Sequence, residues 1–186
     1  AHINFTALSR SSKSGATRSE SLSTPRTSWV RSFEPMEKPS KIFAIAMNNR
    51  ESFDAADKPA DPTPLYFVKI PSSITGPYDA IEIPDIGVVG PEAEVAVIIG
   101  KGGRNIPEGA AHDHIFGYTV HNDLTAHELR DTREWIVFKR PEGDKRLSYA
   151  GRYKCFDTFS PMGPWVVTTD EIVDPNNLKI ESRING

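Results

Sequence analysis

The sequence has a single cysteine, Cys155, among its 186 residues. One cysteine excludes an internal disulfide, argues against a zinc site built on thiolates, and fits a reducing, intracellular compartment. No apolar run approaches the roughly 18 residues that a membrane-spanning helix requires. A formal net charge of −3 gives the chain no global attraction to nucleic acid or to an anionic membrane. Neither is therefore expected as a partner, and a cytoplasmic location is expected.

Acidic residues are scarce at the beginning of the chain, where Glu20 is the only acid among the first 33 residues. Residues 1–40 are rich in Ser, Thr and Arg, and three interpretations stay open. The segment is a disordered leader, a transit-like peptide that would direct the protein to mitochondria, or one or two strands near Val30. The organised domain is expected over residues 41–186.

Short apolar segments separated by Pro- and Gly-rich turns dominate the rest of the chain. This pattern is typical of a β-rich α+β domain with few helices. The final apolar segment runs into Asn185-Gly186, a dipeptide typical of hairpin turns, so a further strand is expected beyond this sequence. Strands are predicted at residues 41–47, 65–70, 81–83, 92–100, 115–123, 165–169 and 178–186, helices at 108–114 and 124–135, and a charged loop at 139–152.

The segment PEAEVAVIIG places two carboxylates at one end of a predicted strand. Because alternate side chains of a strand share a face, Glu92 and Glu94 lie on the same side. Residues 95–99 are apolar on both faces, which predicts a buried strand. Burying two like charges without a partner is costly, and one metal ion would relieve that cost. The alternative is a pair of ordinary acids at a strand end in solvent.

Asp123 ends the apolar segment IFGYTVHND and precedes a predicted helix. The end of a strand is a common place for functional groups, although an Asp followed by Thr125 also suits the cap of a helix. Together with Glu92 and Glu94 it offers only oxygen ligands. Such sets select hard ions, here Mg²⁺, Mn²⁺ or Ca²⁺, over Zn²⁺.

Basic side chains accompany these acids in the sequence. Lys154 lies in the partly apolar segment GRYKCFDTFSPMGPW, where an ammonium group would meet a developing anion; an exposed loop lysine is the alternative. Lys69, inside LYFVKI, either pairs with a buried acid or points outward. His127 and Arg130 follow Asp123 by four and seven residues, so one helix face would aim both toward whatever Asp123 holds.

Four motifs, in this order, resemble those of the fumarylacetoacetate hydrolase family. They are FVKIPSSITGP, PEAEVAVIIG, GYTVHNDLTA and KCFDTFSPMGPW, with LKIESRING as a supporting stretch. The resemblance covers about residues 41–186. It implies a mixed-sheet β-roll, a homodimer, and cleavage, decarboxylation or isomerisation of small 2-oxo or 1,3-dioxo acids.

The resemblance also assigns roles to individual residues. It implies that Glu92, Glu94 and Asp123 bind Mg²⁺ or Mn²⁺, and that Lys154 lies near the substrate. The metal would chelate the oxo acid and stabilise its enolate. We also take His127 as a catalytic candidate, and Arg130, Thr125 and Lys69 as substrate contacts.

Three departures from the family pattern bear on activity. Ser52 stands where many members have a histidine that acts as the base, with Glu51 and Asp54 as the acids nearby. His127 replaces an arginine, and the part of the family domain that closes the pocket is not in this sequence. Two hypotheses remain: an enzyme, with C–C bond hydrolysis the leading reaction, or an impaired homologue that binds metal and ligand without turnover.

Overall fold

The computed structural model describes residues 3–8, 30–31, 39–48, 64–132 and 135–184. They are mostly short strands with few helices, which confirms the predicted β-rich class. None of the helices in the described part is long and apolar enough to cross a membrane. The chain divides into two compact units. The first comprises Ala1–Pro35, Ala93–His121 and Met162–Gly186, and the second comprises Met36–Glu92 and Asn122–Pro161.

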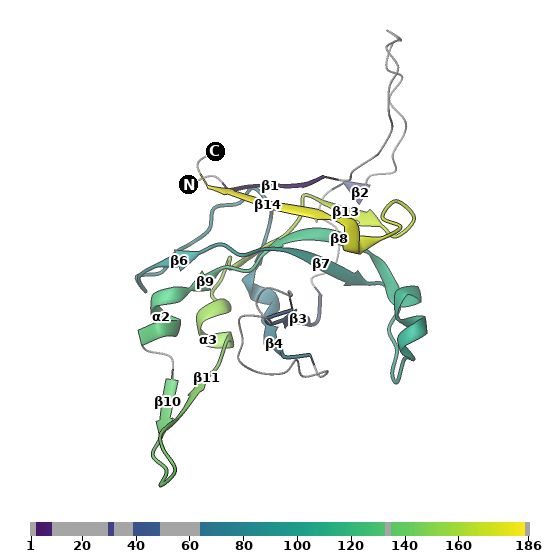
Figure 1. The fold of residues 1–186 in the computed structure, drawn as a ribbon. Coiled ribbons are helices and arrows are strands. Elements are labelled where there is room, and N and C mark those ends of the chain that lie inside the picture. Colours follow the sequence, from purple (N-terminus) through teal and green to yellow (C-terminus); the bar gives the residue numbers. More distant parts are fainter. Residues whose placement is uncertain (1–2, 9–29, 32–38, 49–63, 133–134, 185–186) are drawn as a thin grey trace, which may run out of the picture. The chain divides into compact units, whose positions relative to one another are not determined.

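The first unit is built on a four-stranded sheet with the order β2-β13-β8-β7. Its strands are β2 (Val30–Arg31), β13 (Trp165–Thr168), β8 (Ile115–Asn122) and β7 (Ala93–Ile99). A separate antiparallel ribbon joins β1 (Ile3–Leu8) to β14 (Lys179–Ile184), as Figure 1 shows. The 3-10 helices η2 (Glu108–His114) and η3 (Pro175–Asn177) lie between strands.

Strand β7 was predicted to be buried, and in this respect the prediction is wrong. Val97 and Ile99 are 48% and 63% exposed. Strand β7 is the edge strand of its sheet, so one of its sides has no hydrogen-bonded neighbour among the described strands. An apolar pattern on both faces therefore located the strand correctly but did not report which of its faces the chain covers.

The second unit consists of four short strand pairs around a small core. The core contains Leu124, Ala126 and Phe159, against which Leu129, Tyr153 and other apolar side chains pack. The antiparallel pairs are β3 (Ile42–Ile45) with β4 (Tyr66–Lys69), β6 (Val89–Gly90) with β9 (Thr125–Ala126), and β10 (Trp135–Phe138) with β11 (Lys145–Ser148). The pair β5 (Ile74–Thr75) and β12 (Ser160–Pro161) is parallel, and the helices are η1 (Pro71–Ser73), α2 (His127–Thr132) and α3 (Gly151–Lys154).

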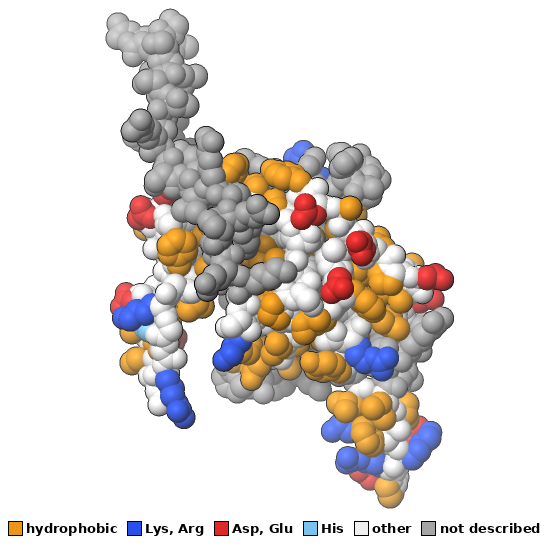
Figure 2. Space-filling view, turned by 180° about the vertical axis from the view of Figure 1, so that it is seen from behind, with side chains coloured by type: hydrophobic (Ala, Val, Ile, Leu, Met, Phe, Trp, Pro, Cys, Tyr) orange, Lys and Arg blue, Asp and Glu red, His pale blue; other side chains and the backbone are white. Residues whose placement is uncertain are grey.

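A β-hairpin replaces part of the predicted helix and of the charged loop. The helix predicted for residues 124–135 is confirmed only as α2, and strand β10 follows it because the aromatic and β-branched residues of WIVF favour a strand. The hairpin β10–β11 runs away from α2 and α3 (Figure 1). It carries hydrophobic side chains toward its base and charged ones toward its turn (Figure 2); Ile136 and Leu147 are 63% and 52% exposed.

Other predictions have mixed outcomes. Residues 81–83 do not form a strand. The strand predicted at 41–47 is confirmed as β3, but it is not buried throughout, since Phe43 is 55% exposed. Among the described strands, β3 pairs with β4 alone. Strands β1 and β2 lie within the first forty residues, and most of that segment lies outside the described residues. The loop that contains Ser52, with Glu51 and Asp54, also lies outside them.

Candidate metal and substrate site

Backbone and side-chain hydrogen bonds align Glu92 with the end of β8. The Asp123 amide donates to the Glu92 carbonyl over 2.9 Å, and the Glu92 amide donates to Asn122 Oδ1 over 3.1 Å. These two bonds place the residue before β7 directly beside the residue after β8. Two acids 31 positions apart in the sequence therefore lie at the same place in the second unit.

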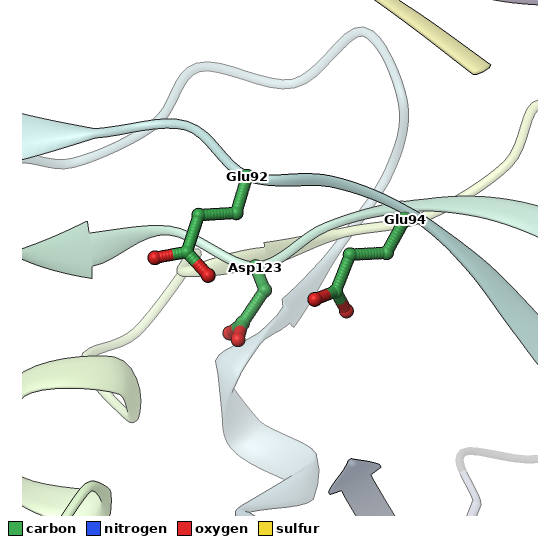
Figure 3. Close-up of side chains that lie close together, drawn as sticks. All are labelled: Glu92, Glu94 and Asp123. Atoms are coloured by element: carbon green, nitrogen blue, oxygen red, sulfur yellow. The ribbon is translucent and has the colours of Figure 1, made fainter. Parts of the chain in front are cut away.

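The three predicted metal ligands present oxygen atoms that lie within 4.8 Å of one another. Figure 3 shows the carboxylates of Glu92, Glu94 and Asp123 converging. The Asp123 side chain is 2% exposed, whereas those of Glu92 and Glu94 are 37% and 36% exposed. Oxygen atoms this close fit a hard divalent cation, and the partial exposure of the two glutamates fits an ion that keeps water or substrate oxygens as ligands.

Lys154 lies against two of these carboxylates. Its Nζ donates to Glu92 Oε2 over 2.8 Å and to Asp123 Oδ2 over 2.6 Å. Burial works against the charged form, but Asp123 and Glu92 outweigh it, so the pKa of Lys154 lies above the ordinary lysine value. The ammonium group also lies 5.5 Å from the centre of the Phe67 ring. Lys154 is the last residue of the short helix α3 and is 8% exposed. The alternative of an exposed loop lysine is therefore wrong.

Lys69 pairs with the other side of Asp123 and is fully buried. Its Nζ donates to Asp123 Oδ1 over 2.5 Å, to the Lys154 carbonyl over 2.5 Å and to the Phe159 carbonyl over 3.1 Å. Burial lowers the pKa of Lys69 against the opposing effect of Asp123. Of the two alternatives that the sequence left open for this lysine, pairing with a buried acid is therefore confirmed.

Thr125 contacts the cluster from strand β9. Its Oγ1 donates to Glu92 Oε1 over 2.6 Å, and the residue is fully buried. The Asp123 carboxylate accepts hydrogen bonds from two lysines, and helix α2 begins only at His127. These contacts hold the carboxylates of Glu92 and Asp123 in place, and they do not support the helix-cap interpretation of Asp123.

His127 and Arg130 were expected to point toward Asp123. In the part of the chain that the structure describes, neither makes a hydrogen bond to it. The Arg130 guanidinium pairs with Asp131, its neighbour in the chain, at 2.7 Å. The His127 ring lies against Gly90, where an added Cβ would come within 2.4 Å of Nε2. Their roles as catalytic and substrate-binding residues stay predictions.

His121 is not among the site residues predicted from the sequence, and the structure places it beside the predicted ligand Glu94. His121 Nδ1 lies 3.3 Å from Glu94 Oε2, and the residue is 4% exposed. Its Nε2 has no hydrogen-bond partner among the described residues. The signal was present in the sequence, because His121 and Asn122 interrupt an apolar strand immediately before Asp123.

Comparisons with known proteins show which proteins this chain resembles. The chain is 40% identical over 156 residues to the protein named oxaloacetate tautomerase fahd2, mitochondrial, of Xenopus laevis, a match that covers 82% of this chain and 44% of the relative. The chain thus spans less than half the length of that relative.

Two solved structures are also similar. One is 5-carboxymethyl-2-hydroxymuconate delta-isomerase from Mycobacterium smegmatis, with a TM-score of 0.55, 30% identity, and coverage of 70% of this chain and 47% of that one. The other is 2-hydroxyhepta-2,4-diene-1,7-dioate isomerase from Mycobacterium marinum, with a TM-score of 0.54, 31% identity, and coverage of 70% and 43%. The family model described as fumarylacetoacetate (FAA) hydrolase C-terminal matches residues 41–186. This chain therefore belongs to the fumarylacetoacetate hydrolase family.

Proposed function

We propose that this chain is part of a metal-dependent enzyme that acts on a small 2-oxo or 1,3-dioxo acid through a stabilised enolate. The observation that supports it most is the convergence of three carboxylates, two of them bound by the Lys154 ammonium group. The relatives support it as well, since their names describe tautomerisation or isomerisation of oxo acids and dienoate diacids. The name of the Xenopus laevis relative favours the mitochondrial alternative for the location of this chain, and the homodimer stays a prediction.

The charges of the cluster suit an anionic substrate. Glu92, Glu94 and Asp123 contribute three negative charges, and Lys69 and Lys154 contribute two positive ones. A divalent cation held by the three carboxylates would turn the resulting net charge of about −1 into about +1. An anionic oxo acid is then attracted, whereas the protein without the ion would repel it.

The metal, when bound, would supply a Lewis acid for the oxo-acid oxygens. We take Mg²⁺ or Mn²⁺ as the ion, because three carboxylates leave positions for substrate oxygens; Ca²⁺ also suits an oxygen-only set. Lys154 then places a second positive charge beside the enolate oxygen. Its bonds to Glu92 and Asp123 keep it beside the carboxylates before the cation arrives.

Among the reactions that share an enolate, we place keto–enol tautomerisation first. It requires only the movement of a proton between carbon and oxygen, and it is the activity in the name of the Xenopus laevis relative. C–C bond hydrolysis, the reaction ranked first from the sequence, also requires an activated water molecule. Its base would be His127 or an acid near Ser52. The impaired homologue remains the alternative.

An activity panel with the full chain tests this proposal. The substrates are oxaloacetate, an acylpyruvate and a dienoate diacid, each with Mg²⁺ or Mn²⁺ and again with EDTA. We expect turnover of at least one substrate that EDTA abolishes, with oxaloacetate tautomerisation followed by the absorbance of the enol. Metal binding without turnover of any substrate class would support the impaired homologue instead.

Thermal unfolding provides an independent measurement of metal binding. At about 100 times the Kd, a bound ion adds about 2.7 kcal/mol to the free energy of unfolding, which corresponds to roughly 5–10 °C in Tm for a chain of this size. We expect this shift with Mg²⁺ or Mn²⁺ in the unchanged protein and its loss in Glu94→Ala. Glu142→Ala, at an exposed acid of the β10–β11 hairpin, is the matched control and should keep the shift.

A further inference from the structure

We propose that Lys69 is a positioning residue for the metal site, an inference that rests on the proposed function. In this role Lys69 does not touch the substrate. It fixes the orientation of the Asp123 carboxylate and ties that carboxylate to the backbone that carries Lys154. The role differs from the substrate contact expected for Lys69 from the sequence.

The hydrogen bonds of Lys69 are complete within the protein. A lysine ammonium group has three protons to donate, and Lys69 Nζ has three acceptors, which are Asp123 Oδ1 and the carbonyls of Lys154 and Phe159. The residue is 0% exposed. No proton is left for a substrate oxygen, and no surface is left for a substrate to reach.

The two oxygen atoms of Asp123 are divided between two lysines that differ in accessibility. Oδ1 accepts from the fully buried Lys69, whereas Oδ2 accepts from Lys154, which is 8% exposed and also bonded to Glu92. An arriving cation can therefore take over Oδ2 and loosen the bonds of Lys154. The bond to Oδ1 stays, because Lys69 has no other acceptor to move to, and it keeps Oδ2 directed toward Glu92.

Replacing each lysine in turn separates a positioning role from a purely electrostatic one, because the two roles predict opposite changes in the affinity of Lys69→Met for Mn²⁺. Lys69→Met and Lys154→Met each remove one positive charge beside the same carboxylates, so charge alone would make both variants bind Mn²⁺ more tightly. A positioning role predicts that Lys69→Met binds Mn²⁺ about 10-fold or more weakly, as for other groups that orient metal ligands, while Lys154→Met binds it at least as tightly as the unchanged protein. The measurement is the Kd of Mn²⁺, from the electron paramagnetic resonance signal of the free ion.

Ser73→Ala is the control for a loss of packing alone. Ser73 is fully buried in the same unit. Its hydroxyl bonds to Ser160 over 2.9 Å and to the Ile70 carbonyl, and among the described residues it makes no hydrogen bond to the carboxylates. It should lower Tm and leave the Kd of Mn²⁺ unchanged. An unchanged or tighter Kd in Lys69→Met overturns the positioning role while leaving the proposed function standing. Failure of the unchanged protein to bind Mn²⁺ contradicts the proposed function itself.

A second measurement uses the unchanged protein and decides the matter if Lys69→Met does not fold. Nuclear magnetic resonance of lysine ammonium groups, assigned through their aliphatic carbons, should show slowly exchanging protons on both Lys69 and Lys154. On addition of Mg²⁺ the Lys154 signal should shift or broaden, while that of Lys69 keeps its protection. Rapid exchange at Lys69 without Mg²⁺, or a response to Mg²⁺ as large as that of Lys154, overturns the inference.

Discussion

Replacing Asp123 by alanine is expected to lower the free energy of unfolding by about 3–5 kcal/mol, the usual cost of removing one partner from a buried ion pair. The reason is that Asp123 accepts from both Lys69 and Lys154. Without it, two buried ammonium groups lose their shared carboxylate. The measurement is urea unfolding of both proteins without metal, which separates this effect from the additional loss of metal-dependent stabilisation.

Asp131→Ala is the matched control for the Asp123 variant. Its carboxylate is 58% exposed and pairs with Arg130 on helix α2. Exposed pairs of this kind contribute little to stability because solvent screens them, so a small change is expected. If Asp123→Ala were as mild as Asp131→Ala, the account of Asp123 as the centre of a buried charge cluster would be wrong.

Replacing Lys154 by methionine is expected to lower kcat by about 10²–10³-fold, the usual effect of removing one group that stabilises a developing oxyanion. Methionine has a similar length and keeps the contact with Phe67, so the change removes mainly the charge. Because the three carboxylates remain, metal binding should persist. The measurement is kcat for the substrate that the activity panel identifies, with saturating Mg²⁺.

Lys139→Met is the control for that variant. Lys139 is 82% exposed and pairs with Asp144 in the β10–β11 hairpin. Among the described residues it makes no hydrogen bond to the carboxylates of the site. It should leave kcat unchanged. A kcat of Lys154→Met within a few-fold of the unchanged protein would remove Lys154 from the chemistry and leave it a structural counter-ion.

Much of the carboxylate site could be predicted from the sequence because its signals are local. The i, i+2 spacing places Glu92 and Glu94 on one face, and Asp123 stands at the end of a strong apolar strand. Their convergence further requires β7 and β8 to be neighbours in one sheet, which they are. Local pattern therefore singled out the three acids, and the long-range pairing of two strands brought them together.

The partners of these acids were harder to predict because they depend on distant contacts. Lys69 lies 54 residues from Asp123, and nothing in LYFVKI distinguishes a paired lysine from one that points outward. The sequence predicts Thr125 as a substrate contact, and in the structure its hydroxyl donates to Glu92. In both cases the residue type was noticed, and only the three-dimensional structure identified its partner.

The β10–β11 hairpin could not be predicted from the sequence for a different reason. Its turn, KRPEGD, is charged and resembles a loop, and its first strand directly follows a helical segment. The strand propensity of WIVF competed there with the helical periodicity of the preceding residues. The sequence consequently predicts that the helix ends at residue 135 rather than at Thr132, and it does not predict strand β11.

We propose that Glu92, Glu94 and Asp123 bind one divalent cation. Anomalous diffraction at the manganese edge, from crystals of the full chain grown with Mn²⁺, tests it most directly. We expect one Mn²⁺ ion with oxygen ligands from all three carboxylates, and with the Lys69 bond to Asp123 retained. Full occupancy of Mn²⁺ elsewhere, or no ion at these carboxylates at saturating Mn²⁺, would contradict it.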